Sequence, residues 1–200
     1  MSQFAVEGAE DVFSSDAAFD ALYPIYISSL SAIHWTPLEV AAKAAVFLAP
    51  DEHARVLDIG AGVGKFCIAG AHFAPGHFTG IEQRANFVKA GNKVARQLGM
   101  ERVALQHGNF METDLGGYTG IYFYNSFHEN IVHDDALDEK VELSSELYER
   151  YTDHLLHELK QMPVGTRLAT YWLSITEIPA CYREQGSYFG DLLKLWIKEY

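Results

Sequence analysis

The chain of 200 residues lacks several features, and each absence excludes a class of protein. It contains only two cysteines, Cys67 and Cys181. They fit neither a disulfide framework nor a zinc site, so we expect reduced thiols and no metal. No apolar run approaches the roughly 20 residues that span a membrane, and the N-terminal residues lack the basic stretch and apolar core of a secretory signal. These absences predict a globular, cytoplasmic protein.

Basic residues are scarce as well: 15 Lys and Arg stand against 27 Asp and Glu, which gives a formal net charge of −12 at pH 7. Neutralising phosphates requires clustered Lys and Arg, so the composition disfavours nucleic acid as a substrate. An acidic surface is compatible with a small molecule, or with a basic protein partner attracted by its field. No feature of the sequence indicates an oligomeric state.

Glycine, in contrast, is concentrated over residues 56–66, which read VLDIGAGVGKF. Apolar residues lead into three glycines that alternate with small residues, and an apolar run typical of a helix follows at once. Backbone can approach a ligand closely where no Cβ is present, and a helix N-terminus offers unpaired N–H groups. The stretch therefore predicts a β-strand, a ligand-binding turn and a helix.

Three kinds of glycine turn compete at this place. A phosphate-binding P-loop needs Ser or Thr after Gly64-Lys65, and the chain has Phe66 there. A dinucleotide-binding turn needs its third glycine one position later than Gly64. The pattern Asp-x-Gly-x-Gly-x-Gly, which begins at Asp58, resembles motif I of the class I S-adenosylmethionine-dependent methyltransferases. In that family the turn holds the methionine part of the cofactor.

Two segments downstream extend this resemblance. Glu82 ends a second predicted strand, where a carboxylate can accept hydrogen bonds from both ribose hydroxyls of an adenosine. A third predicted strand, residues 102–105, leads to Asn109 and Phe110. In the methyltransferases a polar side chain of this loop bonds the adenine amine and an apolar ring packs on the base. Asp is usual where this chain has Asn109, whose amide oxygen can still accept the hydrogen bond.

Upstream of the glycines, residues 36–39 have the pattern of a capping box, with Thr36 as N-cap, Pro37 at N1 and Glu39 at N3. The pattern predicts a helix over residues 37–48. A Thr-Pro element at this place also resembles the cofactor-covering loop of some protein methyltransferases, and a plain helix cap is the alternative. The resemblance implies S-adenosylmethionine as cofactor and the following binding residues: Trp35, Thr36, Asp58, Gly60, Ala61, Gly62, Gly64, Phe66, Glu82, Gln83, Asn109, Phe110 and Asn125.

The predicted fourth strand, residues 120–124, is followed by Asn125-Ser126-Phe127-His128. Loops at the carboxyl ends of parallel strands carry the chemistry of an open α/β sheet. Asn125 to Phe127 is similar to the Asn-Pro-Pro-Tyr/Phe tetrapeptide of amino-methylating enzymes without its prolines. It is closer to the Asn-Asn-Phe of the non-SET histone lysine methyltransferases. That resemblance implies that Asn125 positions the cofactor or the amine and that Phe127 lines a lysine channel.

Two alternatives stay open beside amine methylation. His128 offers a base for an oxygen or small-nitrogen acceptor, unless it only begins a helix. The second alternative is a protein that binds the cofactor without catalysing methyl transfer. The chain lacks a basic nucleosome-binding segment, so the acceptor is expected to be an unidentified protein amine or a small molecule.

Strand alternates with helix over residues 56–174, which predicts a Rossmann-like, doubly wound α/β fold. The resemblance implies a mostly parallel seven-stranded sheet with a late antiparallel strand. We place a helical extension at residues 1–50, packing on or capping the cofactor site, and a methyltransferase domain at 51–200. The apolar pattern further predicts a helical stripe over 13–31, with Pro24 as a kink or a start within it. It also predicts helices over 84–98 and 133–162, a fifth strand over 167–174, and a last strand over 194–200 after a hairpin turn at 186–190.

The glycine pattern generates a direct test of the cofactor. S-adenosylmethionine or S-adenosylhomocysteine is expected to raise the melting temperature, because a ligand that binds only the folded state stabilises it. NAD added separately is expected to leave the melting temperature unchanged. A shift with NAD alone would falsify the assignment.

Overall fold

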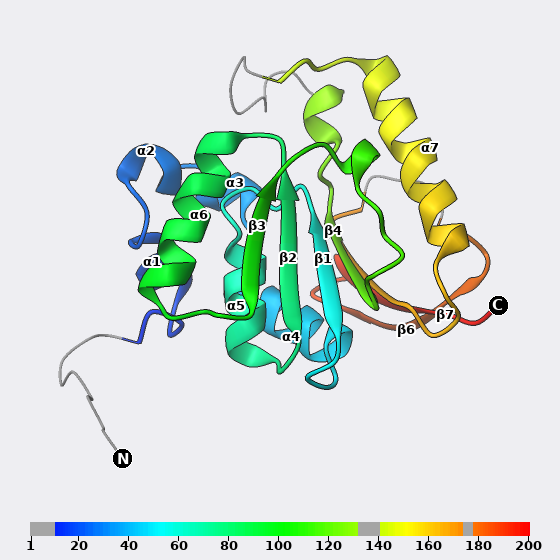
Figure 1. Ribbon diagram of the computed structural model, residues 1–200, viewed down its shortest axis with the longest axis horizontal. Helices are drawn as coiled ribbons and strands as arrows, with labels where there is room; N and C mark the ends of the chain where they lie inside the picture. The colour runs from blue at the N-terminus through cyan, green and yellow to red at the C-terminus, as the bar shows by residue number, and fades with distance from the viewer. Residues whose placement is uncertain (1–10, 132–140, 174–177) are drawn as a thin grey trace.

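The structure is a computed structural model and describes residues 11–131, 141–173 and 178–200. Its centre is a seven-stranded sheet in the order β3-β2-β1-β4-β5-β7-β6 (Figure 1). The first five strands are parallel, and β7 runs antiparallel to both of its neighbours. The predicted fold is therefore confirmed. The strands are β1 Arg55–Ile59, β2 His77–Glu82, β3 Val103–His107, β4 Gly120–Tyr124, β5 Arg167–Tyr171, β6 Tyr182–Tyr188 and β7 Leu193–Lys198.

Helices cover both faces of the sheet. One apolar cluster joins the sheet to α4, α5 and α6, and a second joins the opposite face to α7 (Figure 1). Side chains alternate along β1, so Val56 belongs to the first cluster and Leu57 to the second. The helices are α1 Asp16–Asp20, α2 Ile25–Ser28, α3 Ser31–His34, α4 Leu38–Leu48, α5 Lys65–Phe73, α6 Ala85–Gln97 and α7 Ser145–Gln161, with short 3₁₀ turns η1 Phe110–Glu112 and η2 His128–Asn130. None of the helices in the described ranges is both long and apolar enough to cross a membrane.

The N-terminal segment departs from the predicted helix over residues 13–31. It forms three short helices instead of one, and Pro24 is the N-cap of α2, as the alternative of a start at Pro24 predicted. The predicted capping box is also wrong. Helix α4 begins at Leu38 rather than Pro37, and the Leu38 N–H is capped by Asp16 Oδ1 at 2.9 Å. The Thr36 hydroxyl instead bonds the Tyr122 hydroxyl at 2.9 Å.

The C-terminal half contains two further corrections. Helix α7 begins at Ser145, capped by the Ser144 hydroxyl, and not at 133; residues 132–140 of that prediction lie outside the described residues. Gly186 lies within β6, opposite Leu195 of β7, and not in the hairpin turn. The turn follows at residues 189–192, where Phe189 has φ 55 and Gly190 has φ 66. The fifth strand ends at Tyr171, and residues 174–177 are not among those described.

A buried lysine ties the N-terminal segment to the start of α5. Lys65 is 4% exposed, and its Nζ lies 2.7 Å from carboxylate oxygens of both Asp16 and Asp20. The Tyr23 hydroxyl donates to the Val63 carbonyl at 3.1 Å. Because Asp16 also caps α4, one cation organises the approach of three helices.

Replacing this cation tests its contribution. Lys65→Met leaves Asp16 and Asp20 without their partner, so we expect the free energy of unfolding to fall by about 1.5–3 kcal/mol, the scale of hydrogen bonds to charged groups. Denaturant unfolding measures the change, and Lys89→Met on the exposed side of α6 is the matched control. Equal stability of the two variants would contradict the tether.

Candidate functional site

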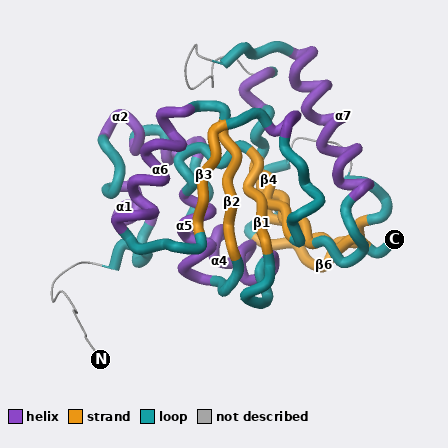
Figure 2. The backbone as a smooth tube through the Cα atoms, viewed as in Figure 1, coloured by secondary structure: helices purple, strands orange, loops and turns teal. Residues whose placement is uncertain are grey.

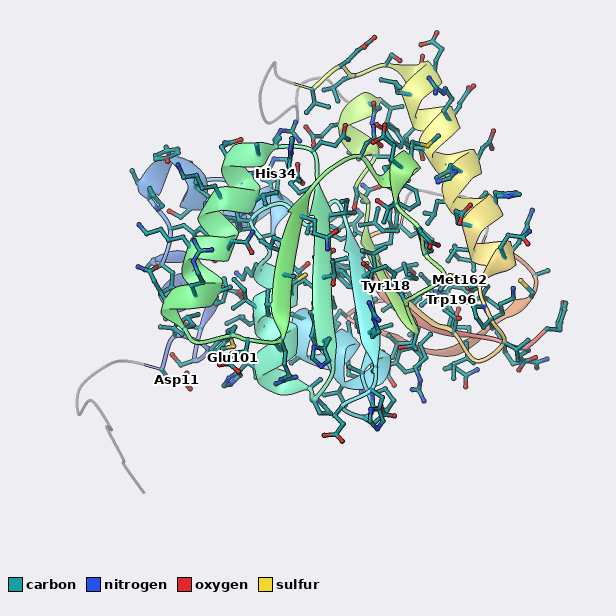
Figure 3. The ribbon with its side chains drawn as sticks, in the orientation of Figure 1. Asp11, His34, Glu101, Tyr118, Met162 and Trp196 are labelled. Atoms are coloured by element: carbon teal, nitrogen blue, oxygen red, sulfur yellow. The ribbon has the colours of Figure 1, made fainter. Side chains whose placement is uncertain are left out.

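A cavity of about 450 Å³ opens at the carboxyl ends of the parallel strands. Figure 2 shows the loops that leave β1, β2 and β3 at this end, at the top of the view, and His34 is labelled there in Figure 3. The volume falls in the range of small-molecule sites. The wall is formed by Leu30, Ala32, Ile33, His34, Trp35, Ile59, Gly60, Gly62, Ile81, Glu82, Gln83, Arg84, Phe87, Gly108, Phe110, Tyr124, Asn125, Ser126, Phe127, His128, Glu129, Asn130, Val141, Leu143, Tyr151 and Trp172.

The glycine turn, residues 60–64, forms the floor of this cavity. Gly60, Gly62 and Gly64 have φ values of 72, 55 and 78, which favour glycine over other residues. A Cβ on Gly60 would lie 2.5 Å from Ser126 Cβ, whereas the position of a Cβ on Gly62 is open, with nothing within 4 Å. The turn therefore leaves a space at its centre that a side chain would fill.

Glu82 holds this turn in place from the end of β2. Its carboxylate accepts hydrogen bonds from the Gly62 N–H at 3.0 Å and the Arg84 N–H at 2.7 Å. The side chain is 7% exposed. Burial raises the pKa of Glu82, while the Arg84 N–H, the Arg84 charge and the Gly62 N–H oppose the rise.

Arg84 links Glu82 to the acceptor loop, which we define as residues 125–130. Its guanidinium bonds both oxygens of Glu129, at 3.1 and 2.7 Å, and one of its nitrogens lies 3.9 Å from Glu82 Oε1. Arg84 is 6% exposed. A bidentate pair of this kind fixes orientation as well as distance, so the loop after β4 is held to the end of β2.

Asn125 occupies an uncommon backbone conformation at the start of the acceptor loop. Its φ of 42 lies in the left-handed region, which Asn tolerates better than most residues. The next residue, Ser126, donates its hydroxyl to the Ile59 carbonyl at the end of β1. Phe127 packs between Phe110 and Tyr151, with ring centroids at 5.9 and 5.2 Å. The loop is thus anchored on both sides.

The structure brings nine of the predicted site residues into the cavity wall: Trp35, Gly60, Gly62, Glu82, Gln83, Phe110, Asn125, Phe127 and His128. The other six lie outside it: Thr36, Asp58, Ala61, Gly64, Phe66 and Asn109. Their functional roles are still predictions.

The structure shows what each of these six residues contacts. Phe66 stacks on Tyr122 at 3.7 Å and is 2% exposed. Asp58 lies beneath the turn, where Cys67 Sγ approaches it at 3.6 Å and burial raises its pKa to about 8. Asn109 uses its amide oxygen to cap η1.

The remaining three positions follow from the turn and its surroundings. Gly64 is the N-cap of α5, with no room for a Cβ because Leu105 would lie within 2.5 Å of it. Ala61 donates its backbone N–H to the Ile81 carbonyl at 3.0 Å. Thr36 faces Tyr122, as described above.

Tyr151 is a wall residue that the sequence analysis did not include. Its hydroxyl accepts from Asn109 Nδ2 at 2.8 Å and lies 3.4 Å from Gln83 Oε1. Tyr151 lies on α7, 42 residues after Asn109. In the sequence, the apolar pattern of that helix indicates that Tyr151 is buried, but not that it lines the cavity. A long-range hydrogen bond of this kind has no spacing rule that a single sequence reveals.

The residues present fit the cofactor that the sequence pattern implies. The open space at Gly62 lies beside the carboxylate of Glu82, which accepts the Gly62 N–H, and Glu82 has lone pairs beyond the two N–H groups it already accepts. Phe110 and Phe87 supply apolar rings to the same wall. The set matches a ligand with a ribose and a flat base.

Removing the Glu82 carboxylate tests this fit. Glu82→Ala is expected to weaken binding of S-adenosylhomocysteine by about 1.5–3 kcal/mol, because hydrogen bonds to a charged group are lost. Calorimetry measures the affinity, and the far-ultraviolet spectrum checks the fold. Glu101→Ala, a change at an exposed acid, is the control. Unchanged affinity of a folded Glu82→Ala protein would remove Glu82 from the site.

Comparison with known proteins agrees with this geometry. A family model described as "Methyltransferase domain" matches residues 50–127. No curated protein sequence matches the chain significantly.

Solved structures share the fold. An RNA methyltransferase from Salinibacter ruber in complex with S-adenosyl-L-homocysteine is 22% identical, with a TM-score of 0.58 over 82% of this chain and 93% of that one. A SAM-dependent methyltransferase from Aquifex aeolicus is 17% identical, with a TM-score of 0.54 over 80% and 89%. TrmN from Thermus thermophilus is 14% identical, with a TM-score of 0.62; 86% of this chain covers 52% of TrmN. Residues 50–127 thus match a methyltransferase domain, and the seven-stranded fold is the Rossmann-like fold of the S-adenosylmethionine-dependent methyltransferases.

Proposed function

We propose that the protein transfers a methyl group to an amine nitrogen. The observation that carries this proposal is Asn125, held in a left-handed conformation at the cavity wall directly after β4. Strained residues persist where the surrounding structure over-determines them, and they cluster at functional sites. An Asn side chain at this place can orient an amine through its amide oxygen.

The charges and rings of the wall support a cationic or amine acceptor. Its carboxylates are Glu82 and Glu129, and Arg84 is the one Lys or Arg among the described residues of the wall. Because Arg84 is paired with Glu129, the wall keeps a negative balance. Aromatic faces attract cations, and Trp35, Tyr124 and Trp172 supply them.

Methyl transfer to an amine needs few protein groups, because the cofactor supplies the electrophile. The bound cofactor supplies an electrophilic methyl group on a sulfonium. With the cofactor bound, the amine nitrogen would gain the methyl carbon as the S–C bond breaks, the nitrogen would lose a proton to solvent, and S-adenosylhomocysteine would be left. Asn125 orients the nitrogen lone pair, while the apolar wall excludes water. Alignment of this kind supplies most of the rate enhancement.

The N-terminal extension is proposed to cover the methionine end of the cofactor. Trp35 lines the cavity directly, next to the segment that Lys65 ties down through Asp16 and Asp20. Lys65 lies 5.6 Å from the Trp35 ring. The tether therefore positions an aromatic side chain beside the glycine turn, which supports a capping role for residues 11–50.

The acceptor is proposed to be a protein amine or a small molecule. The family model that matches describes a general methyltransferase domain, so the closer likeness to the non-SET lysine enzymes stays a prediction. The Salinibacter ruber structure is of an RNA methyltransferase. The net charge of −12 argues against nucleic acid for this chain.

A second candidate rests on His128, which also lies in the cavity wall at the start of η2. An imidazole there can take the proton of an oxygen or small-nitrogen acceptor. The first candidate is favoured because Asn125 fits an amine-methylating pattern, whereas His128 meets only the general need for a base. A binder without catalysis would give no S-adenosylhomocysteine above background with any acceptor.

Two variants decide between these candidates. If Asn125 orients an amine, Asn125→Ala is expected to lower turnover strongly and His128→Ala to cost little. If His128 is the base, its loss is expected to lower turnover by about 10²–10⁴-fold and to remove an acid limb near an imidazole pKa. Methyl-labelled cofactor and product analysis identify the acceptor, and steady-state kinetics with that acceptor measure both variants.

The left-handed backbone calls for one control. Alanine is strained at the φ of Asn125, so Asn125→Gly separates the loss of the side chain from the strain. Both Asn125 variants are expected to be impaired alike. An inactive His128→Ala beside an active Asn125→Gly would remove the amine hypothesis.

A further inference from the structure

Two adjacent strands end in the same uncommon way at this cavity. Tyr124 of β4 and Tyr171 of β5 are paired in the parallel register. The residue after each one is a non-glycine in the left-handed region: Asn125 with φ 42 and Trp172 with φ 48. Both residues line the cavity. The carboxyl ends of β4 and β5 therefore present two neighbouring side chains from the same backbone conformation.

Trp172 is costly to the folded state in two respects. A bulky residue with positive φ is a conformational outlier, since its Cβ is crowded by its own backbone. Its indole is also 56% exposed, although large aromatic residues are usually well buried. The conformation is held by the backbone N–H of Trp172, which donates to the Leu192 carbonyl at 2.9 Å. Packing alone does not explain a residue that is both strained and exposed.

We propose that the Trp172 indole is the face on which a cationic amine acceptor packs, next to Asn125. This inference rests on the proposed function and names the residue that recognises the acceptor before its proton leaves. An indole is the best side chain for a cation–π contact. The negative balance of the wall, which Glu82 supplies while Arg84 pairs with Glu129, attracts the same ligand.

Recognition by Trp172 explains the cost of its conformation. Asn125 provides a hydrogen-bond acceptor for the nitrogen, and Trp172 provides a flat face for its charge and its carbon substituents. Both residues directly follow the paired strand ends Tyr124 and Tyr171, so the rigid sheet sets where the two side chains begin. A rigid support of this kind is what precise alignment of a nucleophile needs.

The chain contains three tryptophans, which allows a direct test. The probe is tetramethylammonium chloride added to the protein saturated with S-adenosylhomocysteine, and the indole N–H signals are followed by NMR. We expect the Trp172 signal, assigned by its loss in Trp172→Phe, to move saturably. The Trp196 signal is expected to stay, because Trp196 bonds Thr170 and lies outside the cavity wall. Sodium chloride and the neutral tert-butanol are expected to move neither signal.

Affinity and stability of variants complete the test. NMR relaxation of the ligand measures the dissociation constant of tetramethylammonium for each variant. We expect this constant to stay within about threefold of the wild-type value in Trp172→Phe, which keeps an aromatic ring. In Trp172→Asn, we expect it to rise about 5- to 30-fold. The melting temperature of Trp172→Asn is expected to be equal or higher, since Asn tolerates the left-handed backbone. Phe189→Asn, at φ 55 in the β6–β7 turn, is the control that changes the same kind of backbone position without affecting binding.

Three outcomes would overturn the inference: an unmoved Trp172 signal, an equal response to tert-butanol, or a Trp172→Asn protein that binds the cation normally. A melting temperature of Trp172→Asn lower by about 5 °C or more would assign Trp172 to packing and overturn it as well. Methyl transfer to oxygen in the product analysis would refute the proposed amine function instead. That result does not depend on the NMR signals, so the two failures are distinguishable.

Discussion

The site depends on one buried carboxylate. Glu82 accepts the N–H of Gly62 in the glycine turn and the N–H of Arg84 at the start of α6. Arg84 in turn holds Glu129 of the acceptor loop. Glu82 therefore holds the floor of the cavity directly, and through Arg84 it also holds the loop after β4 that forms part of the cavity wall. A buried charge is tolerated only when it is paired in this way, which makes the network cooperative.

The buried charge of Lys65 is also paired, in this case with two carboxylates. At the end of a glycine turn, a lysine suggests phosphate binding, but this one points to Asp16 and Asp20 and is almost fully buried. Neutralising two carboxylates with one ammonium allows the N-terminal segment to pack on the turn without leaving an unpaired charge. The segment then brings Trp35 to the cavity. The glycine turn is thus held from both sides, by Glu82 and by the extension.

Local patterns predicted the elements whose cause is local. The glycines of residues 60–64, the acid at the end of β2 and the start of the acceptor loop lie where their spacing placed them, because turns and strand ends depend on neighbouring residues. Predictions failed where a distant partner decided the outcome. Thr36 bonds Tyr122, 86 residues away, and Asp16 caps α4 from 22 residues upstream. No periodicity encodes such pairs.

The two acids of the glycine region show how burial assigns different properties to similar side chains. Both Asp58 and Glu82 are almost fully buried. Glu82 receives two backbone N–H groups and the Arg84 guanidinium, and these oppose the effect of burial on its pKa. Among the described residues, the hydrogen bond that lowers the pKa of Asp58 comes from the Cys67 thiol. Burial and the nearby charge of Glu82 raise that pKa to about 8. These neighbours stabilise the charged form of Glu82, which lines the cavity, while Asp58 can keep its proton beneath the turn. Hydrogen bonds and a nearby cation thus set the two acids apart, although both are buried.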